Sequence, residues 1–153
     1  MPVLELPATR RLRPIERARL AAEIVACYIR ARRAIAREPI ATAIEALRDT
    51  GPGGREAHAA ESAGPAATAG PAVEDARRLG AAVIRMLAFL PGDTRCLIRS
   101  LVLTRMLARR QVAATLVIGA RSSPEFLAHA WVECHGSPVL PTGSGTFSRL
   151  VEL

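Results

Sequence analysis

The sequence predicts an α+β domain in which helices come first and an antiparallel β-meander follows. Two features support this order. Apolar residues recur at helical spacing up to about Arg110, and the pattern then changes to short apolar runs separated by turn residues. The chain of 153 residues is long enough for one domain, and half of its residues are hydrophobic. Because only 3% are aromatic, the core is expected to consist mainly of aliphatic side chains.

The N-terminal region, residues 1–49, is expected to be helical. A first helix runs from Pro14 to about Arg37, with arginines between its apolar residues, and Pro39 suits the first turn of a second short helix. The apolar positions of the two helices are Ile15, Leu20, Ile24, Tyr28 and Ile35, followed by Ile40, Ile44 and Leu47. Residues 50–72 are rich in Gly, Ala, Pro and Ser, which is typical of a flexible linker.

Residues 73–153 are expected to form the main domain. A helix begins at Val73, and the next helix, capped by Asp93 or Thr94, runs to about Arg110. The buried face of the earlier helix is predicted to comprise Leu79, Val83, Met86, Leu87 and Leu90. Strands are predicted at residues 112–120, 125–134, 137–143 and 145–153, with a tight turn at His135-Gly136.

Charge and cysteine content restrict the class of protein. The net charge of +7 comes from Arg alone, which favours an anionic partner such as an acidic peptide, a nucleic acid or a membrane surface. A nucleic-acid binder is a weak interpretation, because neither a zinc pattern nor an aromatic platform on basic strands is visible. Cys27, Cys96 and Cys134 form no C-x-x-C pair, so we expect no disulfide framework, no metal and no cofactor.

The cellular location is predicted from the same features. An odd number of cysteines favours a reducing compartment, and the N-terminal sequence lacks a secretory layout. No segment reaches about 18 uninterrupted apolar residues, the length that a transmembrane helix requires. We therefore expect a cytoplasmic protein without a transmembrane segment.

Cys96, in "PGDTRCLIRSL", is the first residue whose position indicates chemistry. With Asp93 as the N-cap it falls at the third helical position, where backbone N–H groups and the helix dipole stabilise a thiolate. Arg95 and Arg99 add positive charge nearby. The alternative is a small buried core residue, because Cys96 shares a helical stripe with Leu103. The other two cysteines have no such setting and are interpreted as structural.

The stretch "FLAHAWVEC" places a His and the only Trp on one strand. Because side chains alternate along a strand, His129, Trp131, Glu133 and Leu127 share one face, which resembles the wall of a site. The opposite face is predicted to be the core face and carries Phe126, Ala128, Ala130, Val132 and Cys134. The alternative for His129 is a partly exposed sheet face with a satisfied imidazole.

A Cys that opens a helix and a His on a following strand form the arrangement that a thiol nucleophile requires. The imidazole accepts the thiol proton and later protonates the leaving amine. Backbone N–H groups at the start of the helix stabilise the developing oxyanion. This order of helix and strand is that of the transglutaminase-like branch of the papain-type fold.

Residues 96–140 resemble the transglutaminase-like leader peptidases of lasso peptide biosynthesis. The resemblance rests on "CLIRSL" at the helix start, on "VIG" at the end of a strand, and on "FLAHAWVE" before a Gly turn. It covers the C-terminal 60 residues well and extends loosely to the N-terminal helices. It implies a cysteine peptidase that frees a ribosomally made precursor from its leader, with Cys96 as nucleophile and His129 as base. A partner cyclase then closes the ring on the freed amine.

The third catalytic position departs from the family pattern, which has an acidic residue about a dozen positions after the His. Here that count leads to Pro141, and the hairpin places Pro141 or Thr142 opposite His129. The imidazole is then oriented by one of four alternatives: Glu152 from the last strand, Thr142, a main-chain carbonyl or water. Glu133 is a poor substitute, because four strand residues place it about 13 Å along the chain.

The N-terminal half shows no strand pattern of a leader-binding winged-helix module. The sequence therefore resembles the split form of the family, in which a separate recognition protein presents the precursor. The Arg-rich first helix either docks that partner or an acidic leader, or is a solvated basic face. The alternative function is a non-catalytic adaptor that kept the fold and presents the precursor to partner enzymes. Reactivity of Cys96 above that of Cys27 is expected to separate the two functions.

Overall fold

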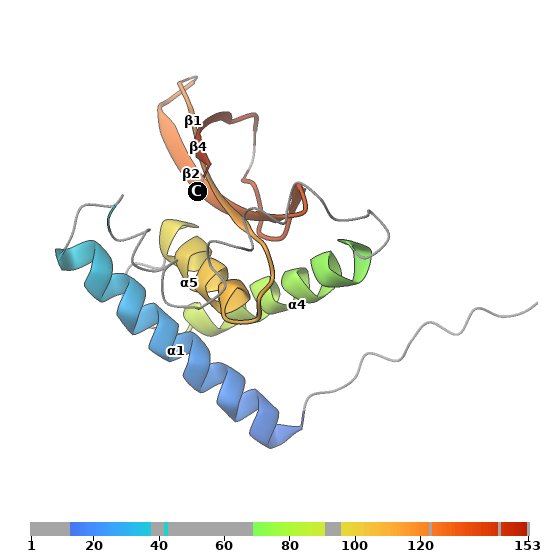
Figure 1. The fold of residues 1–153 in the computed structure, drawn as a ribbon. Helices are drawn as coiled ribbons and strands as arrows, with labels where there is room; N and C mark the ends of the chain where they lie inside the picture. The colour runs from blue at the N-terminus through green and yellow to red at the C-terminus, as the bar shows by residue number, and fades with distance from the viewer. Residues whose placement is uncertain are drawn as a thin grey trace, which may run out of the picture.

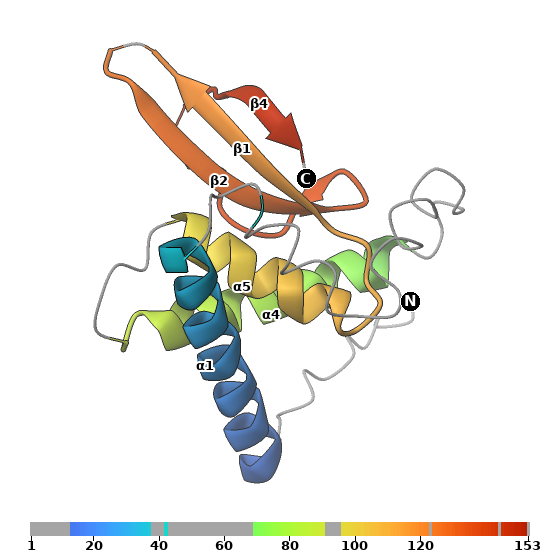
Figure 2. The same ribbon diagram turned by 60° about the vertical axis from the view of Figure 1, so that its left-hand side comes forward.

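The computed structural model describes residues 13–37, 42, 69–90, 96–122, 124–143 and 145–152. Within these ranges, helices cover one face of an antiparallel sheet, and the helix α5 lies nearest to the strands (Figures 1 and 2). The α+β class predicted from the sequence is confirmed. The elements are α1 (Pro14–Arg37), α4 (Ala69–Leu87), α5 (Cys96–Ala108), β1 (Thr115–Arg121), β2 (Leu127–Cys134), β3 (Ser137–Pro138) and β4 (Ser148–Glu152).

Helix α1 has the bounds that the sequence predicts. Pro14 occupies the first helical position, and the Glu16 carboxylate accepts a hydrogen bond from the Arg13 backbone N–H at 2.7 Å, which caps the start. One stripe of the helix is buried against the rest of the core and consists of Ile24, Cys27, Tyr28 and Ala31. Ile15, by contrast, is largely exposed. The predicted second short helix lies outside the described residues, apart from Thr42.

Helix α4 begins at Ala69, four residues before the predicted start at Val73, so the last part of the expected linker is helical. Its Val83 and Leu87 side chains are fully buried, as the apolar stripe predicts. Leu79, Met86 and Leu90 are partly buried against the same core. Residues 50–68 of the expected linker are not among those described.

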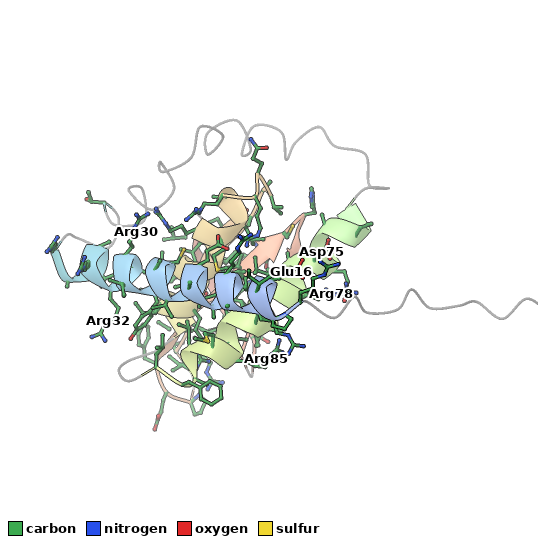
Figure 3. All side chains as sticks on the ribbon, turned by 90° about the horizontal axis from the view of Figure 1, so that it is seen from below. Glu16, Arg30, Arg32, Asp75, Arg78 and Arg85 are labelled. Carbon is green, nitrogen blue, oxygen red and sulfur yellow. The ribbon has the colours of Figure 1, made fainter. Side chains whose placement is uncertain are left out.

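Helix α5 is the centre of the helical layer. It packs against α1 and α4 on one side and against β2 on the other, and its residues from Ser100 to Leu107 are buried all round (Figure 2). Figure 3, a view from below, shows α1 in front, where it crosses α4. Within the described ranges, no helix combines the length and the apolar content that crossing a membrane requires.

The sheet is antiparallel, but its strand order β3-β2-β1-β4 differs from a simple meander. The first three strands follow one another, whereas β4 returns to the free edge of β1 instead of pairing with β3. The β1–β4 register shifts between Ile118 and Gly119, as in a β-bulge. This order places Phe147, which precedes β4, over the strand that carries His129.

The turn at His135-Gly136 is confirmed: both residues have positive φ angles, 49° and 70°, as in a type I′ hairpin. The strand after it is much shorter than predicted, because β3 ends at Pro138. Pro138 and Pro141 lack the N–H that further ladder bonds would use. The chain then leaves the sheet and runs along α4, where Arg77 donates to the Pro138 carbonyl at 3.2 Å.

Gly80 of α4 allows this segment to come close. A Cβ atom at position 80 would lie 2.7 Å from the Val139 carbonyl oxygen and 3.2 Å from the Leu140 side chain. Such a contact is too short to be accommodated without a shift of the backbone. The absence of a side chain at Gly80 therefore sets the path of residues 139–141, which lead directly to the candidate site.

Candidate active site

Cys96 and His129 line one small pocket between the start of α5 and the strand β2. The pocket has a volume of about 70 Å³. Its wall is completed by Arg99, Ala130 and three residues from the neighbouring segments, Ile84, Leu140 and Pro141. The two residues that the sequence singled out as nucleophile and base thus lie in the same pocket, although they are 33 positions apart in the chain.

Cys96 is the first residue of α5 and is partly exposed, whereas Cys27 and Cys134 are buried. The first backbone N–H groups of a helix have no acceptor within the helix, and here they lie beside the Cys96 side chain. The predicted capping residues Asp93 and Thr94, and also Arg95, lie outside the described part of the chain. Position and exposure set Cys96 apart from the two structural cysteines.

The imidazole of His129 is held by a main-chain carbonyl. Its Nε2 lies 2.9 Å from the carbonyl oxygen of Pro141, the residue to which the count of twelve leads. A carbonyl oxygen can only accept, so Nε2 carries the proton in this contact. The neutral ring then has its lone pair at Nδ1, which is the nitrogen able to accept a proton. Thr142, the next residue, is exposed.

Aromatic rings fix the plane of the imidazole from the other side. Trp131 is stacked on His129 with 6.1 Å between ring centroids and an interplanar angle of 19°, and Phe147 lies 5.4 Å away. Gly119 makes room for both rings, because a Cβ there would lie 3.0 Å from each of the Trp131 and Phe147 side chains. Gly143, which has a φ of 80°, lies next to the edge of the imidazole, since a Cβ atom there would lie 3.3 Å from Cδ2 of His129. The ring therefore has little freedom to turn.

The two candidate carboxylates are engaged elsewhere. Glu133 is buried, and its Oε1 accepts hydrogen bonds from Trp131 Nε1 at 2.8 Å and from Arg149 at 2.8 Å. Glu152 lies on β4 and accepts from Arg149 at 2.7 Å. The bond to Glu152, and then the proximity of Glu133, raise the pKa of the Arg149 guanidinium above its ordinary value. Glu133 thus holds the indole of Trp131, the ring that is stacked on His129.

We expect Glu133→Gln to destabilise the fold and Glu152→Gln to be nearly silent. Glu133 is buried, and its two oxygen atoms accept hydrogen bonds from Trp131 and Arg149, whereas the NH₂ group of Gln cannot accept, a cost of roughly 1–3 kcal/mol. Glu152 is an exposed partner of a surface ion pair, and such pairs contribute little. Thermal unfolding and single-turnover cleavage of both variants measure the difference. A loss of cleavage by orders of magnitude in a folded Glu152→Gln protein would assign the orienting role to Glu152 instead.

A larger surface hollow of about 780 Å³ lies between α1, α4 and α5, near the opposite end of α5 from Cys96. It is lined by Leu20, Leu79 and Leu107 together with the charged residues Asp75, Arg78 and Arg85, which are labelled in Figure 3. None of the described residues that line it is a Cys or a His. In the described ranges, no group of three His, Cys, Asp or Glu side chains is placed to hold a metal ion. The smaller pocket at Cys96 is therefore the one with reactive groups.

Sequence reasoning left one contributor to the site open and missed two others. A main-chain carbonyl was one of the alternatives for orienting His129, and the structure identifies it as that of Pro141. Phe147 reaches His129 because β4 pairs with β1, a non-local contact. Gly119 offered the clearest signal, since a glycine inside an apolar strand often marks close approach of another group.

Comparison with known proteins gives one result. A family model described as the transglutaminase-like superfamily matches residues 25–152, from the middle of α1 to the end of β4. Neither the curated proteins nor the solved structures contain a match to the chain. The matched range includes the second half of α1, Cys96 and His129.

Proposed function

The chain belongs to the transglutaminase-like superfamily, and from this premise we propose that it is a cysteine peptidase that removes the leader from a ribosomally synthesised lasso precursor peptide. The superfamily includes cysteine peptidases. The observation that carries the proposal is the shared pocket of Cys96 and His129, in which Nε2 of the imidazole is bonded to the Pro141 carbonyl.

The proposed reaction begins with proton transfer from the Cys96 thiol to Nδ1 of His129. The thiolate attacks the carbonyl carbon of the last leader residue, whose peptide bond joins the leader to the core peptide. The S–C bond forms as the carbonyl π electrons move to oxygen. Free N–H groups at the start of α5 stabilise that oxyanion. When the C–N bond breaks, the imidazolium protonates the leaving amine, which becomes the N-terminus of the core peptide.

Water completes the proposed cycle. The leader remains bound to Cys96 as a thioester, and His129 accepts a proton from the water molecule that hydrolyses it. The Pro141 carbonyl orients the ring but carries no charge, so it stabilises the imidazolium less than a carboxylate does. A thiol is acidic enough to react with this weaker support, and a Cys–His pair is therefore a workable catalyst here.

The substrate is proposed from the motif resemblance, namely "CLIRSL", "VIG" and "FLAHAWVE" in this order. The corresponding partners are a precursor peptide with its leader, a separate leader-recognition protein and a lasso cyclase that uses the freed amine. The three cysteines form no disulfide with one another, which is consistent with work in the reducing cytoplasm.

The division of the chain is also a proposal. Residues 73–153 contain both proposed catalytic residues, and residues 50–72 join them to the N-terminal region, residues 1–49. Helix α1 of that region contributes Ile24 and Cys27 to the same hydrophobic core as α5. We therefore propose that α1 supports the start of the catalytic core and that its exposed arginines face the partner or the leader.

The alternative is an adaptor without activity, and its support is the missing carboxylate at His129. Comparing the thiol reactivity of Cys96 with that of Cys27 does not separate the two functions. Cys27 is 1% exposed, and burial raises the pKa of its thiol, so it reacts slowly in a peptidase and in an adaptor alike. Cleavage of a precursor is the property that distinguishes them.

We expect slow or absent cleavage by this chain alone and a large gain with the recognition protein. The test combines the pure protein with a precursor encoded in its own genomic neighbourhood, with and without the recognition protein encoded there, and reads the products by mass. A released leader and core peptide support the peptidase. Intact precursor in the presence of all partners supports the adaptor, and full-rate cleavage without a partner shows that this chain binds the leader itself.

A further inference from the structure

Arg99 lies one helical turn after Cys96 and lines the same pocket. Residues three positions apart in a helix lie on the same face, so the side chains of Arg99 and Cys96 are neighbours at the start of α5. The remaining wall is mostly apolar, formed by Ile84, Ala130 and Leu140. Arg99 is thus a cationic side chain in the pocket that the proposed reaction does not use.

The guanidinium of Arg99 lacks a carboxylate partner among the described residues. No Asp or Glu is among the described residues that line the pocket. Arg149 and Arg110, by contrast, pair with Glu133 and Glu23. The Nε atom of Arg99 is itself inaccessible, whereas the two terminal nitrogens of the guanidinium are not among the buried polar atoms that lack a partner. A carboxylate that enters the pocket would therefore be bound by these terminal nitrogens, which can form charge-assisted hydrogen bonds to it.

The pocket is small and opens to solvent. Its volume of about 70 Å³ leaves room for a few water molecules, each of which needs roughly 10–15 Å³ of such space. This space suits a carboxylate-sized group. A carboxylate also matches the planar fork of a guanidinium, which binds two oxygen atoms at once.

We propose that Arg99 forms a carboxylate-binding subsite beside Cys96, which selects peptides with an acidic group next to the bond that is cleaved. The choice of a peptide ligand rests on the proposed function, whereas anion binding by Arg99 does not. Arg99 is in this view a specificity residue. The competing role of Arg99 is to stabilise the Cys96 thiolate itself. In that role, loss of Arg99 would slow the reaction of Cys96 with neutral reagents as much as with anionic ones.

Two alkylating reagents of similar size test the subsite without any cleavage. Iodoacetate carries a carboxylate, and iodoacetamide is its neutral analogue. The rates at Cys96 are followed by peptide mass spectrometry in the full chain and in Arg99→Gln, Arg99→Lys and Arg19→Gln. Arg19→Gln removes the same charge from an exposed position on α1. Circular dichroism tests whether each variant is folded. If Arg99→Gln does not fold, Arg99→Lys provides a second measurement of the rate ratio.

The expected result is a fall of roughly tenfold in the ratio of the iodoacetate rate to the iodoacetamide rate in Arg99→Gln, the size of one charge-assisted hydrogen bond. Arg99→Lys retains the charge without the planar fork, so its rate ratio is expected to lie between those of Arg99→Gln and the unchanged protein. Arg19→Gln is expected to keep the ratio of the unchanged protein. An unchanged ratio in Arg99→Gln overturns the subsite. An equal fall with both reagents also overturns it, because it assigns Arg99 to the thiolate. Neither result depends on peptidase activity.

Discussion

Replacement of Cys96 with alanine is expected to abolish leader cleavage while the protein remains folded. The substitution removes the sulfur that forms the thioester, and the neighbouring water has no comparable nucleophilicity. Loss of a covalent nucleophile typically reduces turnover by several orders of magnitude, about 10⁶-fold in a well-studied serine peptidase. Cys96 is partly exposed at the start of α5, so its truncation leaves no closed cavity in the core. Cleavage is measured by mass, and folding by thermal unfolding.

The matched controls are Cys27→Ala and Cys134→Ala, which remove the same atom from buried positions. Both side chains are 1% exposed or less, so these variants are expected to lose stability through cavity formation and to retain cleavage where they are folded. Retained cleavage in a folded Cys96→Ala protein would refute the thiol mechanism.

Replacement of His129 with asparagine is expected to slow cleavage by roughly 10²–10⁴-fold, the contribution of a positioned general base. Asparagine cannot accept and return a proton, and its amide is too short to reach the position of Nε2, so the bond to the Pro141 carbonyl is lost as well. The control is His135→Asn in the exposed turn after β2. His135 has a φ of 49°, and asparagine tolerates this left-handed conformation, so the control is expected to fold and to cleave normally.

Initial rates at saturating recognition protein separate the two histidine variants. Comparable rates for His129→Asn and the unchanged protein would remove His129 from the reaction. A loss of cleavage in His135→Asn with an intact fold would show that the hairpin turn contacts the substrate or the recognition protein.

Local patterns predicted the described helices and the turn at His135-Gly136 well. The stripe through Ile24 and Tyr28 lies on the buried side of α1, and Val132 of the predicted core face of β2 is buried. Both signals lie within one element, so no knowledge of its neighbours is required.

The predicted faces of β2 are wrong at both ends of the strand. Phe126, at 74%, and Ala128 are exposed, because they lie near the tip of the hairpin that extends beyond the helices (Figure 2). Trp131 and Glu133 of the opposite face are buried as well, so the burial of β2 does not alternate there.

Non-local pairing was the part that the sequence could not predict. The return of β4 to β1 depends on contacts between segments about 30 residues apart, and an edge strand with exposed Leu150 and Val151 carries a weak pattern. Because β4 brings Arg149 to Glu133, the same pairing determines that Glu133 is buried and engaged. The orienting acceptor at Pro141 is a backbone atom, for which residue type gives no indication.

The most direct test of the proposed peptidase is interception of its acyl-enzyme. The protein is incubated with precursor and recognition protein in the presence of hydroxylamine, which attacks a thioester in competition with water. The expected product is a leader that ends in a hydroxamate, formed by the unchanged protein and absent from Cys96→Ala. Release of a leader that ends only in a carboxylate, at equal rates from both proteins, would contradict catalysis through Cys96.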